Sequence, residues 1–90
     1  MLKLNNTSQF KKDLKRCHKR GYDLTNLEPI ISLLQNKKPL PKEYKDHDLT
    51  GNYKGCRECH VTSNWLLVYS TDDRQVKLIR TGTHSDLFAI

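Results

Sequence analysis

Residues 56–83 read CRECHVTSNWLLVYSTDDRQVKLIRTGT. Three segments of this stretch are rich in β-branched and aromatic residues, as strands are: 56–61, 65–70 and 76–83. Short polar turns separate the segments, and Thr71-Asp72-Asp73-Arg74 is typical of a hairpin loop. Because connections this short join strands that run in opposite directions, the stretch predicts an antiparallel meander.

Upstream of the meander, the chain predicts a short strand and a helix. Leu2 and Leu4 alternate with polar neighbours, as in a strand, and Thr7 or Ser8 then offers an N-cap. The helix is expected to end near Gly21, because glycine adopts the conformation that stops a helix. Three apolar residues share one face of this helix, which we expect to pack: Phe10, Leu14 and Cys17.

A second helix is predicted over residues 24–35, where apolar residues form a stripe: Leu24, Leu27, Ile31 and Leu34. Pro29 has no backbone N–H to donate within a helix, so the pattern does not determine the residue at which this helix begins. Residues 37–45 are proline-rich and predict an extended connection to the strands. Two helices on one face of the sheet make a two-layer α+β fold, and the length suits a single domain over residues 1–90.

The basic residues are concentrated in the first half of the chain. Residues 1–45 hold 11 Lys and Arg against 4 Asp and Glu, whereas residues 46–90 hold 5 against 6. This placement favours a polyanionic partner, with nucleic acid ahead of an anionic membrane; a merely soluble basic surface is the alternative. Four cations on the polar side of the first helix are candidates for contacting an RNA backbone: Lys12, Lys15, Arg16 and Lys19.

The composition, with 36% hydrophobic and 29% charged residues, is that of a globular domain. Residues 1–6 lack the apolar stretch of a signal peptide, and the longest apolar run, residues 65–69, is far too short to span a membrane. Three cysteines are an odd number in a chain without a secretory signal, so free thiols are expected. We therefore expect a cytoplasmic protein without a membrane partner.

Cys56-Arg57-Glu58-Cys59-His60 matches the C-x-x-C-H pattern of c-type haem attachment. Haem attached in that way belongs to exported proteins, and this chain shows no export signal. Alternation along a strand also turns Cys56 and Cys59 to opposite faces, which argues against a zinc site and a thioredoxin-like redox site. We therefore expect no haem, no metal ion and no other cofactor.

Three of the four histidines lie in the strand half of the chain, each near the end of an element: His47, His60 and His84. Imidazole titrates near physiological pH, so two such rings facing a ribose phosphate can remove the 2′-hydroxyl proton and protonate the leaving 5′-oxygen. That reaction needs no metal. Surface histidines without a joint role are the alternative, because spacing along the chain does not show convergence.

Arginine and aromatic residues near these histidines are candidates for binding RNA. Arg57 and Arg80 can each hold a phosphate with a planar pair of donors, although an ordinary ion pair is an equal possibility. Trp65 and Phe88 can stack on unpaired bases, or can equally belong to the core. Alternation places Cys56, Glu58 and His60 on one face of their strand, and Arg57, Cys59 and Val61 on the other.

Four blocks of the sequence, in register, resemble the YafQ branch of the RelE/ParE toxin superfamily: DHDLTG at 46–51, RECH at 57–60, LLVY at 66–69 and RTGTHSDLF at 80–88. The resemblance implies two N-terminal helices on a twisted antiparallel sheet with a short C-terminal helical turn. It also implies an mRNA interferase, which is a ribosome-dependent endoribonuclease, and a cognate antitoxin protein as partner. The implied catalytic positions are His47, His60 and His84, with Trp65 and Phe88 beside them and Arg57 and Arg80 in support.

One position departs from the family pattern, because Asn64 stands where YafQ-type proteins commonly have aspartate before the tryptophan. A carboxamide is not a general base. We therefore hypothesise that His60 or His47 accepts the 2′-hydroxyl proton, that His84 is the general acid, and that Asn64 only forms hydrogen bonds. Two other functions fit the scaffold: a non-catalytic ParE-like topoisomerase inhibitor and a basic RNA-binding module.

Overall fold

A five-stranded sheet forms the centre of the fold in the computed structural model, which describes residues 1–88. Along the chain the strands and α-helices are β1 (Lys3–Asn6), α1 (Ser8–Lys19), α2 (Glu28–Gln35), β2 (His47–Asp48), β3 (Arg57–Thr62), β4 (Trp65–Thr71), β5 (Gln75–Gly82) and α3 (His84–Phe88). Three short 3-10 turns complete the order: η1 (Leu24–Leu27), η2 (Lys42–Tyr44) and η3 (Gly51–Tyr53). In the sheet the strands follow the order β1-β5-β4-β3-β2.

The predicted meander is confirmed, because β3, β4 and β5 pair in antiparallel fashion through short turns. The sheet as a whole is nevertheless mixed, since β1 pairs with β5 in parallel, with Lys3 opposite Gln75. The expectation of a wholly antiparallel sheet is wrong for this strand. Alternation in residues 2–4 shows which face a side chain takes, and it contains no information on the direction of a partner strand far away in the sequence.

Helix α1 begins and ends where its sequence predicts. The Thr7 hydroxyl oxygen accepts a hydrogen bond from the Phe10 backbone N–H at 3.1 Å, as an N-cap does, and the hydroxyl donates to the Ile79 carbonyl at 3.1 Å. Gly21 follows the helix with φ of +84°, the left-handed conformation that stops it. The same threonine thus caps α1 and ties its start to β5.

The second helical segment starts as a 3-10 turn rather than as an α-helix. In η1 the Asp23 carboxylate accepts from the backbone N–H and the hydroxyl of Thr25, at 3.1 and 2.6 Å. Helix α2 then begins at Glu28, with Pro29 in its first turn, where a missing N–H costs no helical hydrogen bond. The α-helix therefore begins at Glu28, after the 3-10 turn, and not at Leu24.

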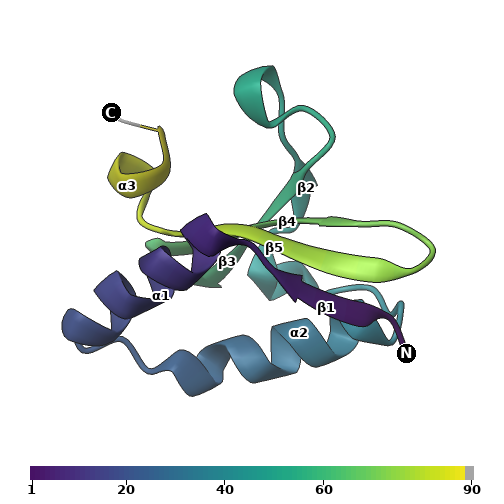
Figure 1. Cartoon of the computed structure of the whole chain (residues 1–90), viewed down its shortest axis with the longest axis horizontal. Helices are drawn as coiled ribbons and strands as arrows, with labels where there is room; N and C mark the ends of the chain where they lie inside the picture. The colour runs from purple at the N-terminus through teal and green to yellow at the C-terminus, as the bar shows by residue number, and fades with distance from the viewer. Residues whose placement is uncertain (89–90) are drawn as a thin grey trace.

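Helices α1 and α2 lie against one face of the sheet, and α3 lies beyond the other (Figure 1). The buried residues on the helix side form the larger core: Leu2, Phe10, Cys17, Leu27, Ile30, Leu34, Cys59, Trp65, Leu67, Tyr69, Val76 and Leu78. On the opposite face, Leu66, Val68 and Leu87 form a smaller cluster. Among residues 1–88, no helix has the length and apolar character needed to cross a membrane.

Candidate active site

The three candidate histidines converge on the face of the sheet that α1 and α2 leave uncovered. His47 comes from β2, His60 from β3 and His84 from the first position of α3. The ring centroids of His47 and His60 lie 6.5 Å apart, and those of His60 and His84 lie 6.1 Å apart. The structure therefore brings together side chains that lie up to 37 positions apart along the chain, from His47 to His84.

A buried carboxylate lies between two of these rings. Glu58 is 3% exposed and stands directly opposite His47 in the β2–β3 pairing. Its Oε1 lies 3.5 Å from Nε2 of His47 and 3.9 Å from Nε2 of His60. A carboxylate removed from water needs polar or charged partners, and the two imidazoles lie within 4 Å and can serve as such partners. Glu58 was not among the candidate residues, although strand alternation had placed it on the face of His60.

Backbone carbonyls orient the two rings that flank Glu58. Nδ1 of His47 donates to the carbonyl of Lys45 at 2.7 Å, so Nε2 of that ring is turned toward the carboxylate. Lys45 adopts the left-handed conformation with φ of 50°, which costs a non-glycine residue roughly 1–2 kcal/mol and aims its carbonyl at the ring. Nδ1 of His60 lies 3.4 Å from the Ser63 carbonyl, a weaker contact.

Two aromatic rings extend the site on the far side of His84. Phe88 is half-buried, with its ring centroid 5.9 Å from that of His84. Tyr53 contacts Phe88 edge to face, with the two centroids 5.7 Å apart. The partly open ring of Phe88 beside His84 is suited to stacking on an unpaired base, as the sequence had suggested. The sequence had not suggested Tyr53.

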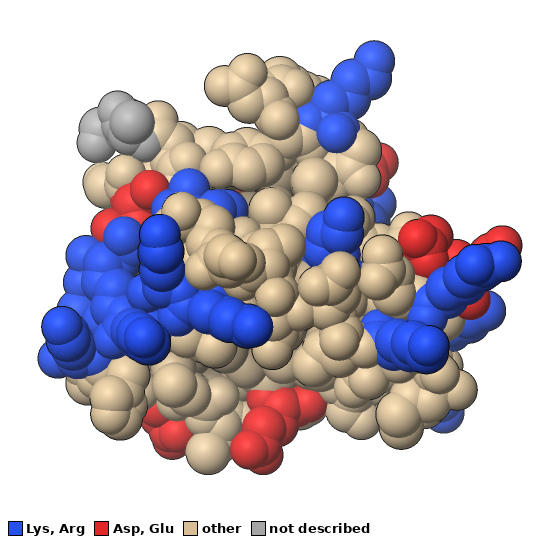
Figure 2. Space-filling model, in the orientation of Figure 1, with Lys and Arg blue, Asp and Glu red and all other residues tan. Residues whose placement is uncertain are grey.

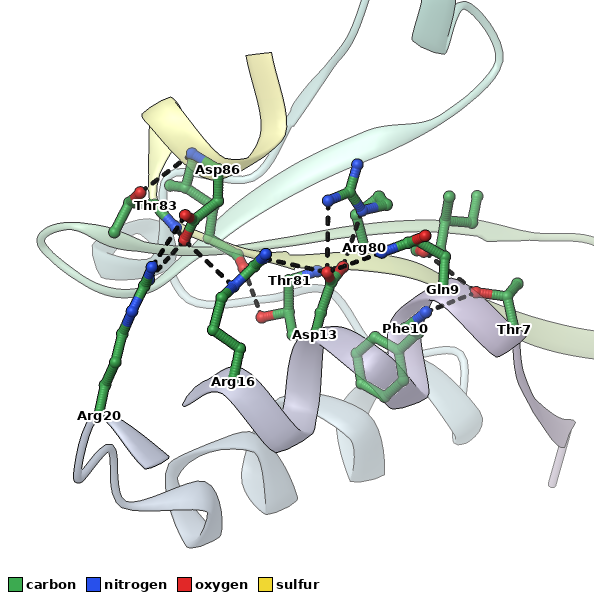
Figure 3. Close-up of polar contacts among 12 residues, drawn as sticks. Thr7, Gln9, Phe10, Asp13, Arg16, Arg20, Arg80, Thr81, Thr83 and Asp86 are labelled. Atoms are coloured by element: carbon green, nitrogen blue, oxygen red, sulfur yellow. Dashed lines mark hydrogen bonds and ion pairs between the residues drawn. The ribbon is translucent and has the colours of Figure 1, made fainter. Parts of the chain in front are cut away.

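Arg80 reaches this site with its charge already paired. Its Nε donates to Oδ2 of Asp13 at 2.8 Å (Figure 3). Its NH1 lies 3.4 Å from the Tyr53 hydroxyl. Asp13 is fully buried, and it also accepts from the Thr81 backbone N–H at 3.1 Å and from Arg16 at 3.0 Å. Hydrogen bonding to Asp13 raises the pKa of the Arg80 guanidinium. The arginine is thus held in place as a cation.

Arg57 is not part of the histidine cluster, because it lies on the opposite face of β3. It donates to Asp46 at 2.9 Å and to Asp48 at 2.5 Å, on either side of His47 in the sequence. The Tyr69 hydroxyl also donates to Asp46. These contacts clamp the two-residue strand β2 onto β3, so Arg57 supports the placement of His47 from the back of the sheet rather than facing it.

Trp65 also lies on the helix side, where it is 3% exposed. Its Nε1 donates to the Thr81 hydroxyl at 2.7 Å, and its ring packs against Tyr22 with centroids 5.1 Å apart. This is a core position rather than a platform for bases. Asn64, by contrast, is exposed in the turn between β3 and β4, next to the residue whose carbonyl contacts His60.

The cationic stripe on α1 is largely as predicted, with one exception. Lys12, Lys15 and Lys19 are exposed, and Figure 2 shows Lys and Arg side chains gathered over this helix. Arg16 is half-buried instead, because its guanidinium pairs with Asp13 at 3.0 Å and lies 3.8 Å from Asp86. A cation with these partners is less available to an RNA backbone than the three lysines.

The C-x-x-C segment divides its cysteines between two clusters. Cys59 is buried on the helix side, whereas Cys56 is half-buried in the smaller cluster on the other face, as alternation predicts. Burial raises the pKa of the Cys59 thiol to about 12. Within residues 1–88, no group of three or more His, Cys, Asp and Glu side chains is arranged to hold a metal ion.

Comparison with known proteins identifies the family. Residues 2–89 match the model of the bacterial toxin of type II toxin-antitoxin systems, YafQ. The mRNA interferase toxin YafQ of Escherichia coli K12 is 43% identical over 83 residues, which cover 91% of this chain and 90% of that one.

Solved structures agree with this match. The crystal structure of YafQ from E. coli BL21(DE3) superposes with a TM-score of 0.91 at 39% identity, covering 98% of this chain and 99% of that one. The E. coli DinJ-YafQ toxin-antitoxin complex gives a TM-score of 0.88 at 41% identity, over 97% of each chain. The chain therefore belongs to the YafQ family of bacterial type II toxin-antitoxin toxins.

Proposed function

We propose that this protein is a ribosome-dependent endoribonuclease that cleaves messenger RNA and that a cognate antitoxin restrains. The observation that carries the proposal is the convergence of His47, His60 and His84 on one open face, with Glu58 between two of them. The name of the E. coli relative, mRNA interferase toxin, supports the substrate class, and the DinJ-YafQ complex supports an antitoxin partner. A toxin that acts on translated messages would work in the cytoplasm.

The reaction is an internal displacement at phosphorus. A neutral imidazole removes the proton of a ribose 2′-hydroxyl, and the 2′-oxygen attacks the adjacent phosphorus. The bond from phosphorus to the 5′-oxygen breaks, and a protonated imidazole delivers a proton to that oxygen. The products are a 2′,3′-cyclic phosphate and a free 5′-hydroxyl. Each properly placed acid or base contributes about 10²–10⁴-fold to such a reaction.

The geometry favours a base on the Glu58 side of the cluster. When His47 or His60 accepts the 2′-hydroxyl proton, it becomes an imidazolium within 4 Å of a buried carboxylate, which stabilises the new charge. His84 lies on the other side of His60 without a carboxylate partner at that distance among residues 1–88, and it is assigned as the general acid. Asn64 is a carboxamide and not a general base, but the proposed reaction does not need a carboxylate at position 64, because Glu58 stabilises the imidazolium of His47 or His60.

The remaining residues bind the substrate. Arg80 stands at the Tyr53 end of the site, where its guanidinium is suited to a phosphate oxygen, and Phe88 offers a face to a base. Asn64, exposed near His60, is assigned hydrogen bonding only. The exposed lysines of α1 would contact ribosomal RNA backbone without reading its sequence.

The deciding experiment expresses the native chain and a His60→Ala, His84→Ala double variant in cells and maps messenger RNA ends, with translation running and blocked. We expect growth arrest and new ends from the native chain alone, and only in translated messages. His18→Ala is the matched control, because His18 is an exposed histidine of α1 outside the cluster.

Two outcomes would contradict the proposal. Growth arrest by both chains without new RNA ends would indicate a non-catalytic binder, such as a topoisomerase inhibitor. Cuts that persist in the double variant would show that the histidines are not the acid and base. Cleavage of ribosome-bound message by the purified toxin in the presence of a chelator tests the metal-free mechanism.

A further inference from the structure

Helix α3 carries two residues of the site but has little means of holding itself in place. It spans five residues, His84–Phe88, and isolated helices of that length do not form in water. Leu87 is its buried apolar residue and packs on the smaller cluster of the sheet. Other contacts must therefore set where His84 and Phe88 lie relative to His60.

Asp86, one turn into this segment, supplies those contacts. Its carboxylate accepts two hydrogen bonds from the Arg20 guanidinium, at 2.6 and 3.1 Å, in the paired geometry that arginine and carboxylate prefer. It also accepts from the Thr83 backbone N–H at 2.9 Å, while the Thr83 hydroxyl oxygen accepts from the Asp86 N–H at 3.2 Å (Figure 3). The side chain is only 13% exposed. One carboxylate thus caps α3 and binds it to the end of α1.

Gly82 allows the close approach of these groups. It has φ of +151°, and a side-chain Cβ at this position would lie 2.7 Å from Oδ2 of Asp86 and 3.2 Å from NH2 of Arg16. Any other residue would push the carboxylate and the guanidinium away. The turn from β5 into α3 therefore needs glycine at position 82, so that the Asp86 carboxylate and the Arg16 guanidinium can lie close to the backbone.

Arg16 links this ion pair to the other end of the site. Its NH2 donates to Asp13, the same carboxylate that holds Arg80. Its Nε is buried, has no hydrogen-bond partner within the described residues, and lies 3.8 Å from Asp86. The two carboxylates and the arginines of α1 form one continuous network along the edge of β5.

We propose that Asp86 is a positioning residue, which acts through Arg16 of α1 and through Arg20, the residue that follows α1, to set the distance between His84 and His60. The inference rests on the proposed cleavage reaction and adds α1 to the parts of the protein that control it. Asp86 touches no reacting atom. Its part is to keep the general acid within reach of the 5′-oxygen, because small misplacements of catalytic groups cost large factors in rate.

The test compares Asp86→Asn, Arg20→Ala and Arg20→Lys, which keeps the positive charge opposite Asp86. The asparagine retains an oxygen for the Thr83 N–H but loses the charge. For Asp86→Asn and Arg20→Ala we expect kcat to fall by about 10- to 100-fold with KM little changed. The alkaline limb of the kcat–pH profile, which reports the general acid, should shift. Arg20→Lys should retain more of kcat than Arg20→Ala, because the lysine still supplies a cation to the Asp86 carboxylate. Lys11→Ala is the control for loss of one exposed cation of α1.

A second readout does not depend on cleavage. Amide exchange and backbone chemical shifts of residues 84–88, measured by NMR, should show α3 loosened in Asp86→Asn and Arg20→Ala, and less so in Arg20→Lys. Unchanged α3 signals, or wild-type kcat and pH profile in Asp86→Asn, would overturn the proposal. If the native chain does not cleave RNA, the proposed function fails, and the NMR comparison still decides whether the ion pair holds α3.

Discussion

The two faces of the sheet differ in what holds them together. Leu67 on β4 points to the helices and is fully buried in the larger core, whereas its neighbour Leu66 points to the histidine side and belongs to a small cluster. On the helix side, hydrophobic burial dominates. On the other side a buried carboxylate and three imidazoles occupy the space, and a network of arginines and aspartates runs along the edge of β5. The comparison assigns most of the folding free energy to one face and the chemistry to the other.

The largest effect is expected from Leu67→Ala. Truncating a fully buried leucine removes apolar contacts and leaves a cavity, so the free energy of unfolding should fall by about 2–5 kcal/mol. Urea unfolding followed by circular dichroism measures it. Leu4→Ala is the matched control, because Leu4 is 40% exposed on the edge strand β1 and should cost much less. A cost for Leu4→Ala equal to that for Leu67→Ala would break the comparison.

A smaller effect on stability, which is lost in acid, is expected from the Asp86 carboxylate. Hydrogen bonds from Arg20 and Thr83 hold the pKa of Asp86 well below its usual value of 3.8. A lowered pKa in the folded state stabilises the protein above the unfolded-state pKa, and that contribution disappears as the pH falls from about 4 toward the folded pKa.

The measurement is the unfolding free energy of the native chain and of Asp86→Asn at pH 7, 5, 4 and 3. The difference between the two proteins should be greatest at neutral pH and shrink below pH 4, whereas the cost of Leu67→Ala should not follow this pattern. A pH-independent difference for Asp86→Asn would show that the charge of Asp86 is not what stabilises the folded state.

His60→Gln should leave stability nearly unchanged, within about 0.5 kcal/mol, while cleavage falls by at least about 10²-fold. The reason is that His60 makes only long contacts, at 3.4 Å to the Ser63 carbonyl and 3.9 Å to Glu58. Thermal melting and single-turnover cleavage of ribosome-bound message measure the two quantities. A marked loss of stability would mean that the histidine side also contributes to holding the fold.

The combined variant Lys12→Gln, Lys15→Gln and Lys19→Gln should have the smallest effect on stability. We expect it to change ribosome binding alone. These exposed side chains make no contact that the fold needs, so unfolding should not change. Ribosome affinity should become less sensitive to salt, by about 0.7–0.9 in the log–log slope for each lysine that contacts a phosphate. Lys11→Gln serves as the control. An unchanged slope in a salt titration would remove α1 from the RNA-binding surface.

Much of the fold was predictable because its signals are local. A cap such as Thr7, a stop such as Gly21 and the alternation of Glu58 and Cys59 depend only on residues a few positions away, and all three are as expected. The three histidines were candidates from their placement near the ends of elements, the family resemblance agreed with that choice, and the structure brings them together. The resemblance did not supply Glu58, although the same alternation marks that carboxylate as facing the site.

Two candidate ligands depend on longer-range information. Alternation placed Arg57 opposite His60, but whether Arg57 is paired and whether Trp65 is buried depend on which segments flank β3 and β4 and on what covers them. Other contacts join segments that are far apart in the sequence. The Arg20–Asp86 ion pair spans 66 positions, and the parallel pairing of Lys3 with Gln75 spans 72. The Asp13–Arg80 ion pair is of similar range.

Amino-acid order alone thus establishes the elements, their inward and outward faces and the family of this protein. Three-dimensional packing establishes which cations are paired, which aromatic ring is buried, and that Glu58 lies between two imidazoles. The physical reason is the range of the interactions. Hydrogen bonds within a turn and alternation along a strand involve near neighbours, whereas strand register and ion pairing are settled only when distant segments bury their apolar surface together.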